Sequence, residues 1–401
     1  MVAVGIDVSK GKSMLAAISE SSIVVAPVEF VHTSVGLKML TETILSFDTT
    51  VKVVMEATGH YHEPVVKALY SAGIFVSVVN PLLIYAYGDN SVRRVKTDKK
   101  DAVKIARYCF DNWHTLEPYI SPESVRGHLK LYSRQYHSCQ KTVHALENNL
   151  QTLLDKTFPG TGTFFASGKK KNGRQKWVDF ALHFWHVEKV ASLGLEAFDA
   201  QYLKWCKNYL YRYSKEKAEI IFKTAAIGFA TLAATKETEL LIVSATKQVI
   251  AMAEILLQLK AELIRLVKLL PEYDTVINMY GVGELTAAHL ISEIGDIKRF
   301  YDGKALVAFA GIDPLPVQSG TYNKKNRETS KRGSATLRKV LFHVVLAHLR
   351  LKPQEEPVYT FLNKKKAEGK PYFVYMTAAA NKFLRIYYGK VRDACCNEQE
   401  S

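Results

Sequence analysis

The first 120 residues alternate between apolar runs and segments with helical spacing. Apolar runs that predict strands lie at residues 2–7, 13–18, 22–30, 51–55 and 74–79. Apolar positions that recur every three or four residues predict helices at residues 33–47 and 63–72. The first three strands follow one another directly, which predicts a meander, and the later strands alternate with helices. This order is typical of an α/β domain with a partly parallel sheet.

Two long helices are predicted in the middle of the chain. Helical spacing runs from Val125 to Leu154, and a second helix runs from about residue 236 to residue 270. The apolar residues of the second helix alternate steps of three and four, at Val249, Met252, Leu256, Leu259, Leu263, Leu266 and Leu270. This spacing is a heptad seam. A helical hairpin within the chain and pairing between protomers would both bury it.

Lysines and aromatic residues share the segment between these helices. The basic stretch SGKKKNGRQKW ends at Trp177, and Phe180, Phe184, Trp185, Tyr209, Tyr211 and Tyr213 follow it. Cations next to rings suit single-stranded nucleic acid, whose phosphates and bases they would contact. Rings in a globular protein more often form a core. We therefore expect buried rings, and lysines between Lys169 and Lys176 that contact nucleic acid.

A hairpin of helices and a basic loop are predicted near the C-terminus. Residues 280–300, YGVGELTAAHLISEIGDIKRF, have the pattern of a helix-hairpin-helix whose glycine turn can offer N–H groups to a phosphate, although a plain packing unit fits too. After an apolar helix at 305–312 comes a loop, DPLPVQSGTYNKKNRETSKRGS, with Ser319 before Gly320. A serine among cations can attack a phosphodiester, although Ser-Gly in a loop is usually a turn.

These patterns divide the chain into six segments. They are an α/β domain at 1–120, a helix at 121–157, a basic and aromatic insertion at 158–235, a heptad coiled-coil helix at 236–272, a mainly α C-terminal domain at 273–350 and a helical basic tail at 351–401.

The net charge of the chain indicates which class of molecule it binds. Lys and Arg number 54 against 39 Asp and Glu, a net charge of +15, which favours nucleic acid over a membrane surface. The five cysteines form no zinc-type spacing and are typical of reduced thiols in the cytosol. We find no signal peptide and no run of about 18 apolar residues, so we expect a cytoplasmic, nucleoid-associated protein of bacterial type and no membrane partner.

Four acids are candidates for a metal site. Asp98 and Asp101 stand three residues apart at the start of a predicted helix, in a basic stretch, and so lie on one helical face. Asp7 and Glu56 end predicted strands, and chemistry in open α/β sheets collects at the carboxyl ends of strands. Four converging carboxylates in a basic protein predict a two-metal site for phosphodiester chemistry, with magnesium as the expected divalent ion. Each acid alone would be a surface carboxylate or a helix cap.

Several motifs together resemble one family. GIDVSK, VVMEATGHYHEPV, VVNPLLIYAYGDNSVRRVKTDKKDA and GVGELTAAHLISEIGDIKRF resemble the IS110 family of insertion-sequence transposases, which includes the Piv-type DNA invertases. The resemblance covers the chain to about Pro118 and again from Thr275 to Leu349. It implies an N-terminal domain with a RuvC-like (RNase H-like) fold and a DEDD metal site, which falls on Asp7, Glu56, Asp98 and Asp101.

The same resemblance implies a mechanism and partners. A serine nucleophile of the C-terminal domain falls on Ser319, although Gln318 stands where the family often has a small residue. Ser330, Ser334 and Tyr322 are the alternative nucleophiles. Implied partners are double-stranded DNA of the element ends and target, an element-encoded guide RNA, and further protomers in a dimer or tetramer. Expected nucleic-acid contacts are Arg93, Arg94, Lys96, Lys99, Lys100, Lys324, Lys325, Arg327, Lys331, Arg332 and Arg338.

Three other functions fit parts of the pattern. A Piv-like site-specific invertase would have nearly the same sequence, and the flanking DNA would tell the two apart. A RuvC-like, metal-dependent junction nuclease would use the four acids and leave Ser319 inert. A non-catalytic nucleic-acid-binding protein would tolerate alanine at all four acids.

Overall fold

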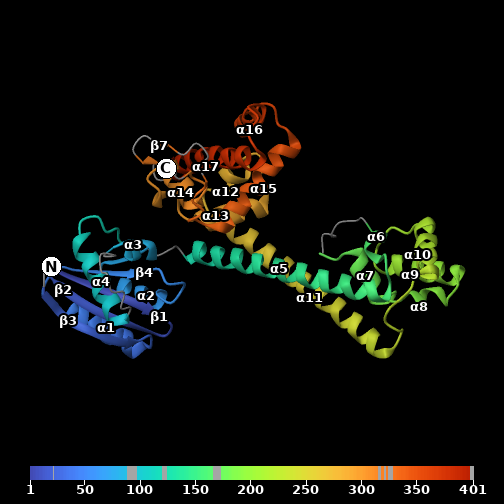
Figure 1. Cartoon of the computed structure of the whole chain (residues 1–401), viewed down its shortest axis with the longest axis horizontal. Helices are drawn as coiled ribbons and strands as arrows, with labels where there is room; N and C mark the ends of the chain where they lie inside the picture. The colour runs from blue at the N-terminus through green and yellow to red at the C-terminus, as the bar shows by residue number, and fades with distance from the viewer. Residues whose placement is uncertain are drawn as a thin grey trace. The chain divides into compact units, whose positions relative to one another are not determined.

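The computed structural model describes most of the 401-residue chain. The described residues are 1–20, 22–87, 97–119, 124–165, 173–314, 318–319, 322–323 and 328–397. Contacts divide the chain into two compact units, Met1–Pro122 and Glu123–Ser401, which are described one at a time (Figure 1). Six of the predicted nucleic-acid contacts lie outside the described residues: Arg93, Arg94, Lys96, Lys324, Lys325 and Arg327. Ser319 is described by its backbone.

A five-stranded sheet forms the first unit. Its strands are β1 (Val2–Ser9), β2 (Lys12–Ser19), β3 (Ser22–Val31), β4 (Val51–Glu56) and β5 (Val76–Val79), in the order β3-β2-β1-β4-β5. The first three strands pair antiparallel as the predicted meander, and β1, β4 and β5 pair parallel. The α/β domain with a partly parallel sheet is therefore confirmed.

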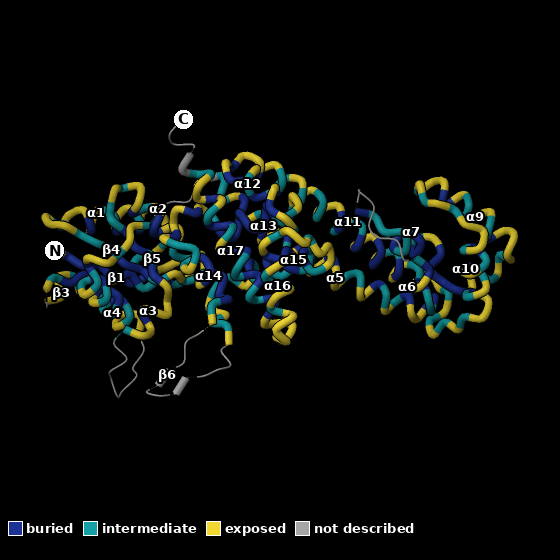
Figure 2. Tube along the Cα trace, turned by 90° about the horizontal axis from the view of Figure 1, so that it is seen from above, coloured by how far each residue is buried: buried dark blue, intermediate teal, exposed yellow. Residues whose placement is uncertain are grey.

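Helices cover the two faces of this sheet. They are α1 (Ser34–Leu45), α2 (Glu63–Ser71), α3 (Pro81–Ala86) and α4 (Asp98–Asp111). Leu40 of α1 and Val66 of α2 share a core with Val4 and Ile6, whereas Ile105 of α4 packs with Ala3 on the opposite face. Successive strand residues point to opposite faces, so β1 is buried along most of its length (Figure 2).

The strand β1 and the helix α4 approach each other closely at Gly5. A Cβ on Gly5 would lie 2.1 Å from the backbone nitrogen of Ala106 and 2.3 Å from the carbonyl oxygen of Ala102. Ala102 and Ala106 are one helical turn apart and are fully buried. Small residues on both sides of this contact bring the α4 backbone directly onto the central strand.

The two long predicted helices pack antiparallel in the second unit. They are α5 (Ser124–Thr157) and α11 (Lys236–Val267). Leu150 near the end of α5 shares a core with Ile242 near the start of α11, and Leu129 shares another with Leu263. The hairpin within the chain therefore buries both ends of the heptad seam, while Met252, Leu256 and Leu259 between them are half-buried.

The helix α11 is also long and apolar enough to cross a membrane, judged by length and composition alone. It packs against α5, α7 (Lys176–His183) and α13 (Glu284–Ile294), so its apolar residues have partners within the fold. Such a helix is weak evidence for a membrane.

The insertion forms its own helical cluster around an aromatic core. It contains α6 (Thr161–Phe164), α7, α8 (Val187–Ala191), α9 (Leu195–Asn208) and α10 (Lys215–Ile227). Phe180, Phe184, Tyr202 and Trp205 are buried in one cluster, with Tyr209, Tyr211 and Tyr213 packed against it. The prediction that the rings of this segment form a core is confirmed.

The C-terminal part of the second unit is almost entirely helical. It contains α12 (Tyr273–Ile277), α13, a 3-10 turn η1 (Ile297–Arg299), α14 (Gly303–Ala310), α15 (Ala335–Leu351), α16 (Pro357–Ala367) and α17 (Tyr372–Asn397). The turn between α12 and α13 has Gly281 at φ 78°, in the left-handed region that favours glycine. The first residue of α13, Glu284, forms an ion pair with Lys268 at 2.9 Å. Phosphate binding by this hairpin stays a prediction.

Gly5→Ala tests the contact between β1 and α4. The added methyl group would collide with backbone atoms of α4, so we expect the first unit to lose about 3 kcal/mol of stability. Hydrogen exchange of α4 amides would report the loss as faster local opening. Gly127→Ala is the matched control, because nothing lies within 4 Å of a Cβ there and alanine favours a helix. Unchanged α4 protection in Gly5→Ala would contradict the close approach.

Candidate functional site: an acidic pocket and a serine loop

Asp7 and Glu56 occupy matched positions on neighbouring parallel strands. The β1–β4 register pairs Gly5 with Val54 and Ile6 with Met55, so Asp7 and Glu56 are the next pair along. Neighbouring strands are about 4.8 Å apart, and these two residues lie on the face that carries Gly5. That is the face covered by α4. Both acids therefore project toward the helix from the carboxyl ends of their strands.

The start of α4 supplies the other two acids. Thr97 caps the helix by accepting a hydrogen bond from the Lys100 backbone N–H at 3.4 Å, and Asp98 and Asp101 lie in the first turn. Carboxylates are favoured at a helix N-terminus, where the helix dipole is positive. The close contact at Gly5 holds this turn over the ends of β1 and β4.

All four acids line one cavity. Its volume is about 410 Å³, and Asp7, Glu56, Asp98 and Asp101 share the wall with Ser9, Tyr85 and Lys104. Ser9 and Tyr85 were not predicted. Lys104 ends the basic stretch around Asp98 and Asp101, and it follows Asp101 by three residues and so shares its helical face.

Charges around the cavity are mixed. Glu29 accepts a hydrogen bond from Lys12 at 2.8 Å and raises the pKa of the Lys12 amine, and the charge of Asp98 raises it further. Thr58 donates a hydrogen bond to Glu56 at 3.2 Å, which orients that carboxylate. The acidic cavity is thus bordered by cations and hydroxyls that hold its edge.

The donor set of this cavity fits a hard divalent cation, because all four acids offer carboxylate oxygens. Among the residues that the structure describes, no three His, Cys, Asp or Glu side chains are grouped closely enough to hold one ion as they stand. Binding of one ion by three or more of these carboxylates would therefore require them to move closer together.

Ser319 lies in a hairpin whose base is held by several contacts. Strand β6 (Gln318–Ser319) pairs antiparallel with β7 (Tyr322–Asn323), so Ser319 and Tyr322 are opposite each other. Pro314 bridges to Thr329 where the two sides of the loop meet. The two proposed site components lie in different units of the chain.

Two of the alternative nucleophiles have structural hydrogen bonds. The Ser330 hydroxyl donates to Asp313 at 2.6 Å, which joins the two ends of the loop. The Ser334 hydroxyl donates to Glu293 at 2.9 Å and accepts from the Leu337 backbone N–H as the cap of α15. Both hydroxyls therefore have roles in holding the fold, and the choice of nucleophile stays a prediction.

The described basic residues divide into two groups. Lys99 and Lys100 on α4, and Lys331 and Arg332 beside the serine loop, are exposed and available to phosphates. Arg338 instead donates hydrogen bonds to the carbonyls of Ala310 and Gly333, both at 3.0 Å, and so braces the loop. Its contact with nucleic acid stays a prediction.

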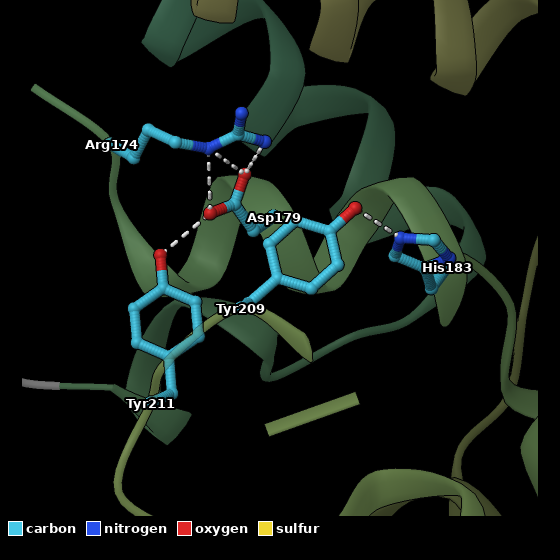
Figure 3. Close-up of polar contacts among 5 residues, drawn as sticks. All are labelled: Arg174, Asp179, His183, Tyr209 and Tyr211. Atoms are coloured by element: carbon cyan, nitrogen blue, oxygen red, sulfur yellow. Dashed lines mark hydrogen bonds and ion pairs between the residues drawn. The ribbon is translucent and has the colours of Figure 1, made fainter. Parts of the chain in front are cut away.

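The polar residues of the insertion form a network that holds the fold. The side chains of Arg174 and Tyr211 converge on Asp179, and the Tyr209 hydroxyl contacts His183 at 2.7 Å (Figure 3). Asp179 is 1% exposed, and its hydrogen bond and charge raise the pKa of Arg174 above its usual value. This buried ion pair is bordered by aromatic rings.

Lys176 lies among rings of the same core. Its amine donates to the Arg212 carbonyl at 3.0 Å and stands 5.1 to 5.9 Å from the ring centres of Phe165, Tyr202, Trp205 and Tyr211. Lys176 is half-buried against these rings, and its contact with nucleic acid stays a prediction. Lys169, Lys170 and Lys171 lie outside the described residues.

Comparisons with known proteins relate two segments of the chain to transposases. A DEDD-type IS110 transposase model matches residues 4–159, and the transposase IS116/IS110/IS902 family model matches residues 273–360. The pilin gene-inverting protein of Moraxella lacunata is 22% identical over 346 residues, 86% of this chain and 81% of that protein. The IS110 43.6 kDa protein of Streptomyces coelicolor is 21% identical over 324 residues, 80% and 77% of the two chains.

Two further proteins are similar to only part of this chain. The IS1111A transposase of Coxiella burnetii is 40% identical over 74 residues, 18% of this chain and 19% of that protein. RuvC of Thermus thermophilus, solved with a Holliday junction substrate, is 14% identical, covers 30% of this chain and 99% of its own, and has a TM-score of 0.24.

These matches define an enzyme class, the DNA recombinases that transpose or invert DNA segments. Within that class, the chain belongs to the IS110 family of insertion-sequence transposases. The resemblance read from the sequence is thus confirmed. Membership of this family supports DNA as the substrate, a divalent metal as the cofactor and the cytoplasm as the location.

Asp98→Asn tests the acidic cavity as a metal site. Loss of one carboxylate charge should weaken binding of Mn²⁺ by about tenfold or more, because each charge contributes to holding a dication. Calorimetric titration of the full chain with Mn²⁺ alone measures the change. The control is Asp48→Asn, an exposed acid of the same unit that does not line the cavity. Equal affinity in both variants would remove the metal assignment.

Asp179→Ala tests the network of the insertion. Removing the carboxylate leaves Arg174 without its buried partner, so we expect a loss of about 3 to 5 kcal/mol in the helical cluster. Urea unfolding followed by tryptophan fluorescence measures it. The control is Asp199→Ala, which removes a half-buried carboxylate that accepts one hydrogen bond, from Tyr213 at 2.7 Å. The free energy of unfolding should fall by about 1 kcal/mol in this variant. Similar losses in the two variants would disprove a special role for Asp179.

Proposed function

We propose that this protein is the transposase of an insertion sequence that cuts and rejoins DNA through the hydroxyl of Ser319, with divalent ions held by four acids. The observation that carries the proposal is that Asp7, Glu56, Asp98 and Asp101 line one cavity within the segment that matches a DEDD transposase model. Four carboxylates at one cavity in a chain of net charge +15 repel one another unless cations lie between them.

Magnesium is the proposed ion, because carboxylate oxygens and phosphate both suit a small hard cation. When bound, the ions would neutralise charge on the phosphate oxygens during strand exchange. Lys104 adds a fixed cation to the wall of the cavity, and Lys99 and Lys100 offer exposed charge nearby on the same helix. The mixed sheet with an acid on its central strand supports a RuvC-like domain as part of the proposal.

The proposed covalent step is a transesterification, in which one phosphate ester bond forms as another breaks. As the Ser319 oxygen bonds to phosphorus, the bond from phosphorus to a deoxyribose oxygen breaks. The serine hydroxyl gives up its proton, and the released sugar oxygen takes one. Attack by a sugar hydroxyl of another strand then reverses the exchange and restores the serine, so no phosphodiester energy is lost. The exposed cations Lys331 and Arg332 beside the loop would hold the phosphate.

The proposal includes partners. The acids and Ser319 belong to different units of the chain, which supports a composite site in a dimer or tetramer, with the acids of one protomer next to the serine of another. The family resemblance also implies a guide RNA encoded by the element. Such an RNA is compatible with the strong positive charge.

A Piv-like invertase is the second candidate. It is favoured by the likeness to the pilin gene-inverting proteins of two Moraxella species, which spans 86% of this chain. Inverted sites around a DNA segment would support inversion, and element ends with a nearby RNA gene would support transposition. The third candidate, a RuvC-like junction nuclease, would not need Ser319.

A suicide DNA substrate tests the mechanism. The full chain, with Mg²⁺ and any guide RNA, should form a covalent adduct with an element-end DNA whose cleaved strand cannot be rejoined. Mass spectrometry should map the DNA to Ser319. Ser319→Ala should reduce adduct formation by about 10³-fold or more.

Two variants control this experiment. Tyr322→Phe removes the hydroxyl opposite Ser319 in the hairpin and should leave the adduct intact. Asp98→Ala should reduce adduct formation strongly, and any residual adduct should still map to Ser319. An adduct on Tyr322, or cleavage at full rate by Ser319→Ala, would sink the serine mechanism and leave the metal assignment standing.

A further inference from the structure

A second cavity lies along one side of α17 in the C-terminal part of the chain. Its volume is about 650 Å³, within the usual size range of ligand sites. None of the four acids lines it. Its wall combines aromatic rings, small residues and cations, and it plays no part in the function proposed above.

The α17 residues of this wall form a stripe that changes in character along the helix. Phe373 and Val374 lie at the start, Thr377 and Ala378 one turn later, and Asn381, Lys382 and Arg385 toward the other end. These spacings of three and four place them on one helical face. The opposite face, with Met376, Phe383 and Tyr387, is buried in the core and fixes the orientation of the stripe.

Aromatic rings stand at the apolar end of the cavity. Phe361 of α16 is half-buried, and Phe373 of α17 is 70% exposed. The Lys365 amine stands 5.7 Å from the centre of the Phe361 ring. An exposed ring at a cavity mouth costs stability in water and is typical of a binding surface.

The other end of the cavity is polar and positively charged. The side-chain amide of Asn381 can both donate and accept hydrogen bonds, and Lys382 and Arg385 carry positive charge. Twelve residues of helix separate Phe373 from Arg385, about 18 Å at 1.5 Å per residue. The cavity therefore presents a ring, an amide and then two cations in succession. A nucleotide strand presents the matching groups, a base with a flat face and a polar edge, and then phosphates.

This cavity adjoins the serine loop. Pro314 and Thr329 line it, and they are also the two residues that bridge the base of the loop. Five residues separate Pro314 from Ser319, so even a fully extended chain keeps the serine within about 18 Å of the cavity wall. A strand held at Ser319 can therefore reach the cavity within a few nucleotides.

We propose that this cavity takes one unstacked base of the DNA strand on which the protein acts, with the base against Phe361 and Phe373, its edge at Asn381 and the adjoining phosphates at Lys382 and Arg385. An apolar side chain from a second copy of the chain is less well matched, because it would leave an amide and two cations without partners. The position near the attacked phosphate rests on the proposed function. Base binding itself does not require the Ser319 hydroxyl.

Photo-crosslinking tests the proposal. An element-end duplex would carry 5-iodouracil at one position at a time, within about six nucleotides of the cleavage site. Irradiation of its complex with the full chain should give a crosslink to the peptide containing Phe361 or Phe373 from one position. Phe373→Leu should reduce that crosslink by about tenfold, because stacking on one ring is lost. Phe373 is exposed, so leucine there leaves the fold intact.

Matched variants separate the two proposals. Phe229→Leu changes a phenylalanine that is 83% exposed on another part of the chain, and should keep the full crosslink. Ser319→Ala should also keep it while losing the covalent adduct, so failure of the serine mechanism would leave the cavity assignment intact. Three results would each overturn the cavity assignment. They are no crosslink to these peptides from any position of the DNA, a crosslink to RNA or to another copy of the chain instead, and an undiminished crosslink in Phe373→Leu.

Discussion

The contact of α4 with the central strand at Gly5 is the constraint on which the acidic cavity depends. Two acids come from strand ends and two from a helix, and they line one cavity because the helix backbone approaches the strand closely enough to leave no room for a Cβ on Gly5. Ala102 and Ala106 supply the flat helical surface that this approach needs. Any larger side chain at these three positions would lift Asp98 and Asp101 away from Asp7 and Glu56.

In the second unit, several contacts hold the base of the loop that contains Ser319. The loop with Ser319 begins and ends at paired backbone, and Ser330 joins its two ends through Asp313. Ser334 binds Glu293 of α13, and Arg338 of α15 binds the carbonyl of Ala310 at the end of α14. Charged residues next to the loop therefore divide into those that brace it and those exposed to a phosphate. The long hairpin of α5 and α11 joins this region to the insertion, whose stability comes from an aromatic core and the buried pair of Arg174 and Asp179.

Much of the fold follows from local patterns. Alternating strands and helices predicted the sheet of the first unit, because side-chain period and turn residues report backbone conformation over a few residues. The boundaries agree closely: the predicted helix at 33–47 is α1 at Ser34–Leu45, capped by Thr33. The aromatic residues of the insertion were correctly expected in a core. The position of Lys176 against those rings was not expected, because residue type alone does not report which side chains surround a lysine.

The sequence by itself determined the elements, the positive charge, the family and the candidate acids, since each is carried by residue type and short-range spacing. Only the tertiary structure decided that the four acids line one cavity, because strand register and helix docking join residues far apart in the chain. It also decided that the heptad seam is buried at both ends by α5, a choice between partners that periodicity cannot make. The cavity beside the serine loop draws on α16, α17 and the loop base, and no stretch of sequence contains that arrangement.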